Sequence, residues 1–203
     1  MDYAALKTQL DNYTHRADLS TEYDTWIALV ESELNLELRT RQQLTSTTIA
    51  MVGVPTDTIA LPSDFLQMRN LELATSPVTP LKYVTSEQRD FYDLKASTGK
   101  PRIYDISGSN IILAPQPDQV YTLNIEYYAQ IPTLPSNTTN WLITNFPHVY
   151  LYGCLSQAGG YLLDSDRLQI FVQAYADAKA KISKADDDAV YNSSPRMRAD
   201  VGW

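Results

Sequence analysis

Apolar side chains recur at helical spacing near the start of the chain. Over residues 21–38 they fall at i, i+3, i+4, i+7 and i+11, which is the spacing of one buried helix face. Ser20 or Thr21 is the predicted N-cap of this helix, and a shorter helix is predicted over residues 2–15. The opposite face of the longer helix is acidic, so we expect it to be solvated or to meet a basic partner. The residues of the apolar face are Tyr23, Trp26, Ile27, Val30 and Leu34.

The pattern becomes strand-like between residues 41 and 131. β-Branched residues dominate residues 43–53, and short alternating runs follow, separated by prolines. A short helix is predicted at residues 87–97, and Gly108-Ser109 joins two strand-like runs as a tight hairpin. The longest alternating run is residues 120–131. These features predict a small, mostly antiparallel sheet of about five to seven strands.

Helical spacing returns towards the C-terminus. Asn145 is the predicted cap of a helix that carries Pro147 in its first turn, where the missing backbone donor of proline does no harm. A second helix is predicted from a cap at residues 164–166 to residue 185. From Asp186 onward the helical pattern fails, so residues 186–203 are predicted to form an extended arm. The apolar positions of the two helices are Leu151, Cys154, Leu155, Ala158 and Leu162, then Leu168, Phe171, Val172, Tyr175 and Ile182.

Helices at both ends with strands between them predict an α+β fold. We expect a helical bundle formed by N-terminal and C-terminal helices, residues 2–38 and 145–185, with an inserted, mostly antiparallel β-sheet module at residues 41–131. Residues 1–185 would then form a single domain, followed by the arm.

Charge and composition narrow the classes of function. The net charge of −8 argues against tight, sequence-independent binding of nucleic acid, because neutralising phosphates requires clustered Lys and Arg. No stretch is long and apolar enough to cross a membrane, and the first residues show no export signal. The single cysteine cannot form an internal disulfide. We therefore expect the chain to fold in a reducing compartment inside a cell.

The sequence shows no arrangement of residues that is typical of a catalytic or metal-binding site. His15 and His148 have no further metal ligands at suitable spacing, and Cys154 repeats with the apolar face of its helix. Ser107-Gly108-Ser109 does not match a nucleophile elbow. We expect no catalytic residue, no cofactor and no metal.

Two other functions remain open on the residues alone. Carboxylate pairs such as Glu31 with Asp24 or Glu37, and Asp90 with Glu87, could serve a cell-wall hydrolase, since glycoside cleavage needs two acids roughly 5–10 Å apart. The 14 tyrosines could stack on sugars in a carbohydrate-binding module. Tyrosine is also enriched at protein interfaces, and we prefer that interpretation.

The order of segments along the chain gives a more specific indication. LPSDFLQMRNLEL, PLKYVTSEQ and GKPRIYDISG precede GSNIILAPQPDQVYTLNIEYYAQIPTLP, and NWLITNFPHVYLYGCLSQAGGYLLDSD follows. This series resembles the head-to-tail adaptor (connector, head completion) family of short-tailed bacteriophages over about residues 5–190. The resemblance implies a structural virion protein at the head–tail junction, assembled in the host bacterial cytoplasm. It also implies a ring of about twelve copies under the portal protein, which joins the portal to the tail nozzle or tail tubular protein and continues the DNA channel.

The resemblance also implies where the contact surfaces lie. In the family the C-terminal segment docks on the portal and the β-rich part faces the tail, while the helices are the natural walls between subunits. The candidates for the portal-binding arm are Tyr191, Pro195, Arg196, Met197, Arg198 and Trp203. The candidates for subunit–subunit contact are Glu31, Glu33, Glu37, Tyr150, Tyr161, Lys179 and Lys181. The candidates for tail-facing loops are Asp57, Ser63, Ser76, Lys100 and Arg102.

Overall fold

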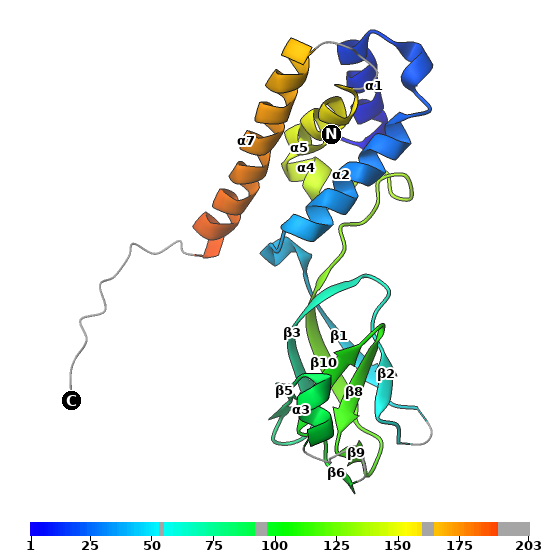
Figure 1. Ribbon diagram of the computed structural model, residues 1–203, viewed down its shortest axis with the longest axis vertical. Helices are drawn as coiled ribbons and strands as arrows, with labels where there is room; N and C mark the ends of the chain where they lie inside the picture. Colours follow the sequence, from blue (N-terminus) through cyan, green and yellow to red (C-terminus); the bar gives the residue numbers. More distant parts are fainter. Residues whose placement is uncertain (53–54, 92–96, 160–164, 191–203) are drawn as a thin grey trace, which may run out of the picture. The chain divides into compact units, whose positions relative to one another are not determined.

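Two compact units make up the chain in the computed structural model (Figure 1), which describes residues 1–52, 55–91, 97–159 and 165–190. One unit is formed by residues 1–41 together with 131–203, and the other by residues 42–130. The first is helical, and the second is built from strands that pair mostly antiparallel. The predicted α+β class, with helices from both chain ends packed together and strands between them, is confirmed.

The helical unit is organised around one central helix. Helix α5 contacts α1, α2, α4 and α7. All five apolar positions predicted for α2 are buried in the core of this unit, which confirms the helical period from which they were identified. The helices are α1 (Tyr3–Thr14), α2 (Tyr23–Glu37), α4 (Trp141–Asn145), α5 (Pro147–Gln157) and α7 (Ser165–Val190), with 3-10 turns at Ala17–Leu19 and Arg41–Gln43.

The start of α2 differs from the prediction that Ser20 or Thr21 caps it. The N-cap position is Glu22, whose side chain makes no capping hydrogen bond. The backbone N–H of Glu22 donates to the carbonyl of Leu19 at 2.9 Å, so the preceding 3-10 turn leads directly into the helix. A turn of this kind satisfies backbone groups at the helix start without a capping side chain, which explains why the cap prediction is wrong.

The second predicted cap, Asn145, is also misplaced. A short additional helix, α4, ends at Asn145 and is capped by Asn140, whose side-chain oxygen accepts from the backbone N–H of Ile143 at 2.8 Å. Helix α5 then begins after Phe146, with Pro147 in its first turn as predicted.

Helix α7 continues to Val190, five residues beyond the predicted end at 185. Its last turn has a tertiary contact that apolar periodicity does not reveal, because the Asp186 carboxylate accepts from the backbone N–H of Arg41 at 3.2 Å. Residues 186–190 are therefore helical and do not belong to an extended arm. Tyr175 and Ile182 are buried as predicted, whereas Val172 is 51% exposed, so its assignment to the buried face is wrong.

The β unit contains two four-stranded sheets and a two-stranded pair, not the single sheet of five to seven strands that the sequence predicts. The sheet orders are β1-β10-β3-β4, β2-β8-β7-β5 and β6-β9. The strands are β1 (Leu44–Ala50), β2 (Thr58–Ala60), β3 (Phe65–Leu73), β4 (Thr79–Pro80), β5 (Lys82–Tyr83), β6 (Thr98–Gly99), β7 (Ile103–Ser107), β8 (Asn110–Ala114), β9 (Gln116–Pro117) and β10 (Thr122–Ala129).

Alternating side chains of both four-stranded sheets build the core of the β unit. Every second residue of β10 is buried, which confirms the alternation predicted for this segment. β7 and β8 form the predicted hairpin through Gly108, whose φ of +60° favours glycine. The core of this unit includes Leu71, Leu73, Ile111, Leu113, Leu123 and Ile125.

A buried ion pair attaches the short helix α3 (Ser86–Phe91) to strand β7. The Arg89 guanidinium donates to the Asp105 carboxylate at 3.0 Å, and the Ser86 hydroxyl donates to the same oxygen at 2.6 Å. Asp105 is 1% exposed and Arg89 is 7% exposed. Removing either partner would leave the other charge buried without its counter-ion, so the pair keeps α3 at this edge of the sheet.

Candidate functional site

The carboxylate of Glu31 lies inside the helical unit, not on its outer acidic face. Glu31 is 3% exposed, and its carboxylate accepts from the backbone N–H of Leu134 at 3.0 Å and from the hydroxyl of Tyr150 at 2.9 Å. The side-chain amide of Asn140 donates to the same hydroxyl at 2.7 Å. These bonds tie α2 and α5 to the segment that precedes α4.

Glu31 and Tyr150 are therefore wrong as candidates for contact with a second subunit, because the fold of one chain already covers them. The spacing of residues along α2 already indicates that Glu31 is close to the buried face. Glu31 follows Ile27 by four residues and precedes Leu34 by three, so it lies beside the apolar stripe of α2. A buried acid at such a position needs hydrogen-bond donors, and the segment 131–140 provides one of them.

Burial shifts the acidity of this cluster. Loss of solvent raises the pKa of Glu31, and the hydrogen bonds from Leu134 and Tyr150 oppose this shift only in part. Burial and the nearby carboxylate of Glu31 also raise the pKa of Tyr150 and of the Cys154 thiol. Cys154 is fully buried and stays a protonated thiol that packs in the core, as its position on the apolar face predicts.

Three of the other subunit-contact candidates bridge α7 and α2 within one chain. The ammonium group of Lys179 is 2.7 Å from a Glu33 oxygen and 2.8 Å from a Glu37 oxygen. The same ammonium lies 4.7 Å from the ring centre of Tyr175. Lys181 is exposed on α7, and Tyr161 lies outside the described residues. The charges of Lys179, Glu33 and Glu37 are therefore already partly neutralised by contacts within one chain.

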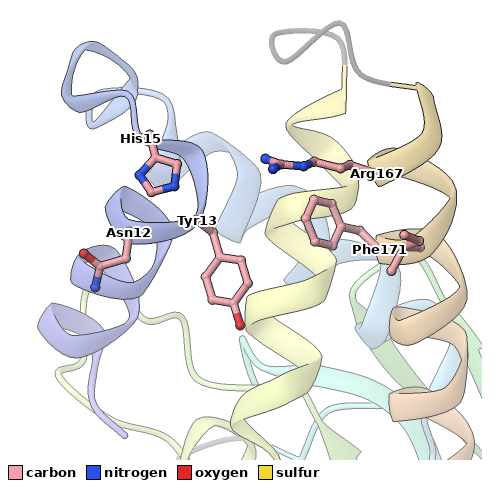
Figure 2. Close-up of a pocket in the computed structure, with 6 residues that line it drawn as sticks. Asn12, Tyr13, His15, Arg167 and Phe171 are labelled. Carbon is pink, nitrogen blue, oxygen red and sulfur yellow. The ribbon is translucent and has the colours of Figure 1, made fainter.

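A cleft of about 420 Å³ lies between the end of α1 and the start of α7. Figure 2 shows Tyr13 and Phe171 facing each other across it, with His15 and Arg167 towards the upper rim. The two aromatic rings meet edge to face, with centroids 6.5 Å apart. The walls of the cleft are mainly apolar, and Tyr13 is 41% exposed.

The histidines occupy structural positions. His15 ends α1 in the left-handed region at φ 52°, and its backbone N–H donates to the carbonyl of Asp11. His148 stacks on Tyr152 at 5.9 Å. Among the residues that the structure describes, no group of three or more His, Cys, Asp or Glu side chains could hold a metal ion.

Each carboxylate pair considered for glycoside cleavage has at least one member that is engaged in another contact. Asp24 accepts from the Tyr3 hydroxyl and lies 2.9 Å from the ammonium of Lys7. Glu31 is too deeply buried to reach a sugar. Asp90 pairs with Arg89 at 3.2 Å. The geometry therefore gives the hydrolase interpretation no support at these pairs.

Basic side chains line a cleft of about 470 Å³ in the β unit, which we call the basic cleft. Its described lining residues are Lys82, Val84, Gln88, Gly99, Lys100, Arg102, Ile103 and Pro115. The Lys100 ammonium donates to the hydroxyls of Thr79 at 2.6 Å and Thr75 at 3.2 Å. These bonds bring together the loops containing Ser76 and residues 97–102, two of the loops that the sequence predicts to face the tail.

The other two tail-facing candidates lie elsewhere in the β unit. Asp57 lies just before β2, and its backbone carbonyl accepts from the backbone N–H of Leu113 on β8. Strands β2 and β5 are at opposite ends of this sheet. Ser63 is exposed just before β3. The structure thus places Lys100 and Arg102 in one cleft and separates Asp57 from it. The portal-binding candidates, residues 191–203, lie outside the described residues.

Comparison with known families identifies the class of protein. The sequence model of the SU10 adaptor protein family matches residues 1–199, nearly the whole chain. The chain therefore belongs to the SU10 adaptor protein family, a phage adaptor family with a structural role. No curated protein matches the chain. No helix in the described ranges has the length and apolar character needed to cross a membrane.

Proposed function

We propose that this protein is the head-to-tail adaptor of a short-tailed bacteriophage, forming a ring of about twelve copies between the portal and the tail. The family match over residues 1–199 is the observation that carries this proposal. A ring requires one flank of each subunit to fit the opposite flank of its neighbour. The helical unit has exposed surface for such a contact.

The contact between subunits is best placed on α1 and α7. Ile170 and Val172 are 65% and 51% exposed on α7, and Tyr13 is 41% exposed on α1. Large apolar side chains on a solvated helix face mark a surface suited to another protein. These residues replace Glu31 and Tyr150, which are internal.

The acidic balance of the chain suits a passage for DNA. Each copy carries a net charge of −8, so a closed ring would present few sites that hold phosphates. DNA would then pass through the lumen without specific binding. A lumen found to be strongly basic by cryo-electron microscopy would contradict this part of the proposal.

The partners proposed for the two faces of the ring are the portal and the tail nozzle or tail tubular protein. Residues 191–203 include Arg196, Arg198 and Trp203, residue types that are enriched among energetically important interface positions. The turn containing Ser76 and the loops containing Asp57 and Ser63 are the proposed tail-facing surface.

Deletion of residues 193–203 tests the portal-binding role. We expect the truncated chain to keep its circular dichroism spectrum and melting behaviour and to lose co-sedimentation with the portal. A truncated chain that still bound the portal with unchanged affinity would contradict the proposed role of this segment.

A further inference from the structure

The basic cleft concentrates positive charge within an otherwise acidic chain. Lys82, Lys100 and Arg102 line it together, and its described lining contains no acidic side chain. Within the described part of the chain, no carboxylate forms an ion pair with any of these three residues. Three like charges around one cavity repel each other, and an anion bound between them would relieve that repulsion.

The backbone holds the cleft in place before any ligand arrives. The Lys82 N–H donates to the Arg102 carbonyl at 3.0 Å, where β5 pairs with β7. The Arg102 N–H donates to the Ala114 carbonyl at 3.0 Å. The threonine hydroxyls fix the end of the Lys100 side chain. Binding would therefore require little ordering of the cleft itself, which favours affinity.

The lining favours a peptide carboxylate over a nucleic acid. Val84, Ile103 and Pro115 give the cleft apolar surface beside its cations. A phosphate backbone is held by cations spread along an open groove, usually with aromatic side chains for the bases. An acidic segment with neighbouring apolar side chains matches both parts of this lining.

The chain itself contains such a segment at the end of α7. Asp187 and Asp188 are exposed in the last turn, and Ala189 and Val190 follow. Asp186 is already bound to Arg41, whereas in the described ranges no cation pairs with Asp187 or Asp188. The last turn of α7 has no basic residue, although the negative end of a helix dipole favours cations. A cationic partner would therefore stabilise this helix end.

We propose that the basic cleft of one copy of this chain receives residues 187–190 of a second copy. The contact joins two different surfaces, so it can repeat around a ring. This inference rests on the proposed assembly into rings and names one of the contacts that hold neighbours together. Asp187 and Asp188 meet the three cations, and Ala189 lies against the apolar part of the cleft.

A peptide-binding experiment tests the contact directly. The probe is a fluorescent peptide of residues 182–191, ISKADDDAVY, titrated into the full chain carrying Asp187→Asn and Asp188→Asn, which removes competition from the chain's own segment. We expect saturable binding that weakens with salt. Lys100→Gln with Arg102→Gln in the same chain should weaken it about tenfold or more. A peptide with three Asn in place of the Asp run should not bind.

The matched control is the pair Arg69→Gln and Lys184→Gln, which removes two exposed cations that do not line the basic cleft and should leave peptide binding unchanged. Circular dichroism shows whether each variant is folded. Absence of peptide binding, or equal loss of binding in the control pair, would overturn the proposal.

Assembly with the portal then separates this inference from the proposed function. Normal ring formation by the Lys100→Gln, Arg102→Gln chain would overturn the contact and leave the adaptor function intact. Failure of the unaltered chain to join the portal would overturn the function, whereas the peptide result would still report on the cleft. Restored assembly when a Lys100→Glu, Arg102→Glu chain is mixed with an Asp187→Lys, Asp188→Lys chain would support the contact.

Discussion

At the scale of single residues, the carboxylate of Glu31 is held inside the helical unit by partners from distant parts of the chain. It accepts one backbone and one side-chain hydrogen bond while nearly excluded from water. The apolar stripe of α2 could be predicted from spacing alone. The role of Glu31 could not, because it depends on Leu134 and Tyr150, more than one hundred residues away in the chain.

Replacing Glu31 by Gln should change how the stability of the helical unit depends on pH. The native pKa of Glu31 is raised by burial, while the unfolded pKa is about 4.3. The native state therefore retains the proton to higher pH than the unfolded state does. Relative to Glu31→Gln, the wild-type free energy of unfolding should be highest below about pH 4 and should fall as pH rises through the raised pKa.

Urea unfolding followed by tryptophan fluorescence at a series of pH values measures this difference. Trp26 lies in the core of the helical unit and Trp141 packs against that core, so their fluorescence reports on this unit. Asp187→Asn, which removes an exposed carboxylate, is the control for loss of charge. A difference between wild type and Glu31→Gln that does not change with pH would contradict the expectation.

Removing the hydroxyl of Tyr150 should destabilise the same unit. Tyr150→Phe deletes the donor to Glu31 and the acceptor for Asn140, so we expect a loss of about 1–2 kcal/mol in the free energy of unfolding. Tyr152→Phe, on the same helix but half-buried, is the matched control and should cost less. Equal effects of the two substitutions in urea unfolding would argue against the buried network.

At the scale of elements, the helices other than α4 and most strands could be predicted from periodicity, whereas their ends could not. The start of α2 depends on the 3-10 turn before it, the start of α5 on the short helix α4, and the end of α7 on a contact with Arg41. Similarly, alternation predicts strands but not which sheet they join. The strands of the two four-stranded sheets are interleaved along the sequence, so only tertiary contacts divide them.

Helix α5 approaches its neighbours at Gly153, where a side chain has no room. A Cβ there would lie 2.9 Å from a methyl group of Val30 on α2 and 3.1 Å from the ring of Tyr175 on α7. Gly153→Ala should destabilise the helical unit by about 1–2 kcal/mol, because overpacking outweighs the gain of about 1 kcal/mol in helix propensity. Urea unfolding measures the effect.

A second substitution serves as the control for the close helix contact. Val30→Ala removes the two methyl groups that the new Cβ would meet. The cost of Gly153→Ala should therefore be smaller when Val30→Ala is already present. Additive effects of the two substitutions would show that close packing at Gly153 is not the cause.

At the scale of the whole molecule, the chain enters and leaves the β unit through neighbouring strands. β1 begins at Leu44 and β10 ends at Ala129, and Leu44 pairs with Tyr128 in an antiparallel register. The two points at which the chain crosses between units are therefore close together. Such an arrangement allows one unit to be inserted into another without disturbing its core.

Excision of the β unit should leave a folded helical unit. We expect a chain in which a short Gly-Ser linker replaces residues 42–130 to retain a helical circular dichroism spectrum and a cooperative unfolding transition. The core of the helical unit contains only its own residues, which is the physical reason for this expectation. A molten or aggregated product would show that the β unit is needed for the helices to pack.

Family membership and the two units together lead to one central expectation, assembly with a portal. Analytical ultracentrifugation of the purified chain, alone and mixed with its portal protein, measures it most directly. The adaptor function predicts a small free species that joins the portal in about a dozen copies. A chain that remains monomeric and never sediments with the portal would contradict it.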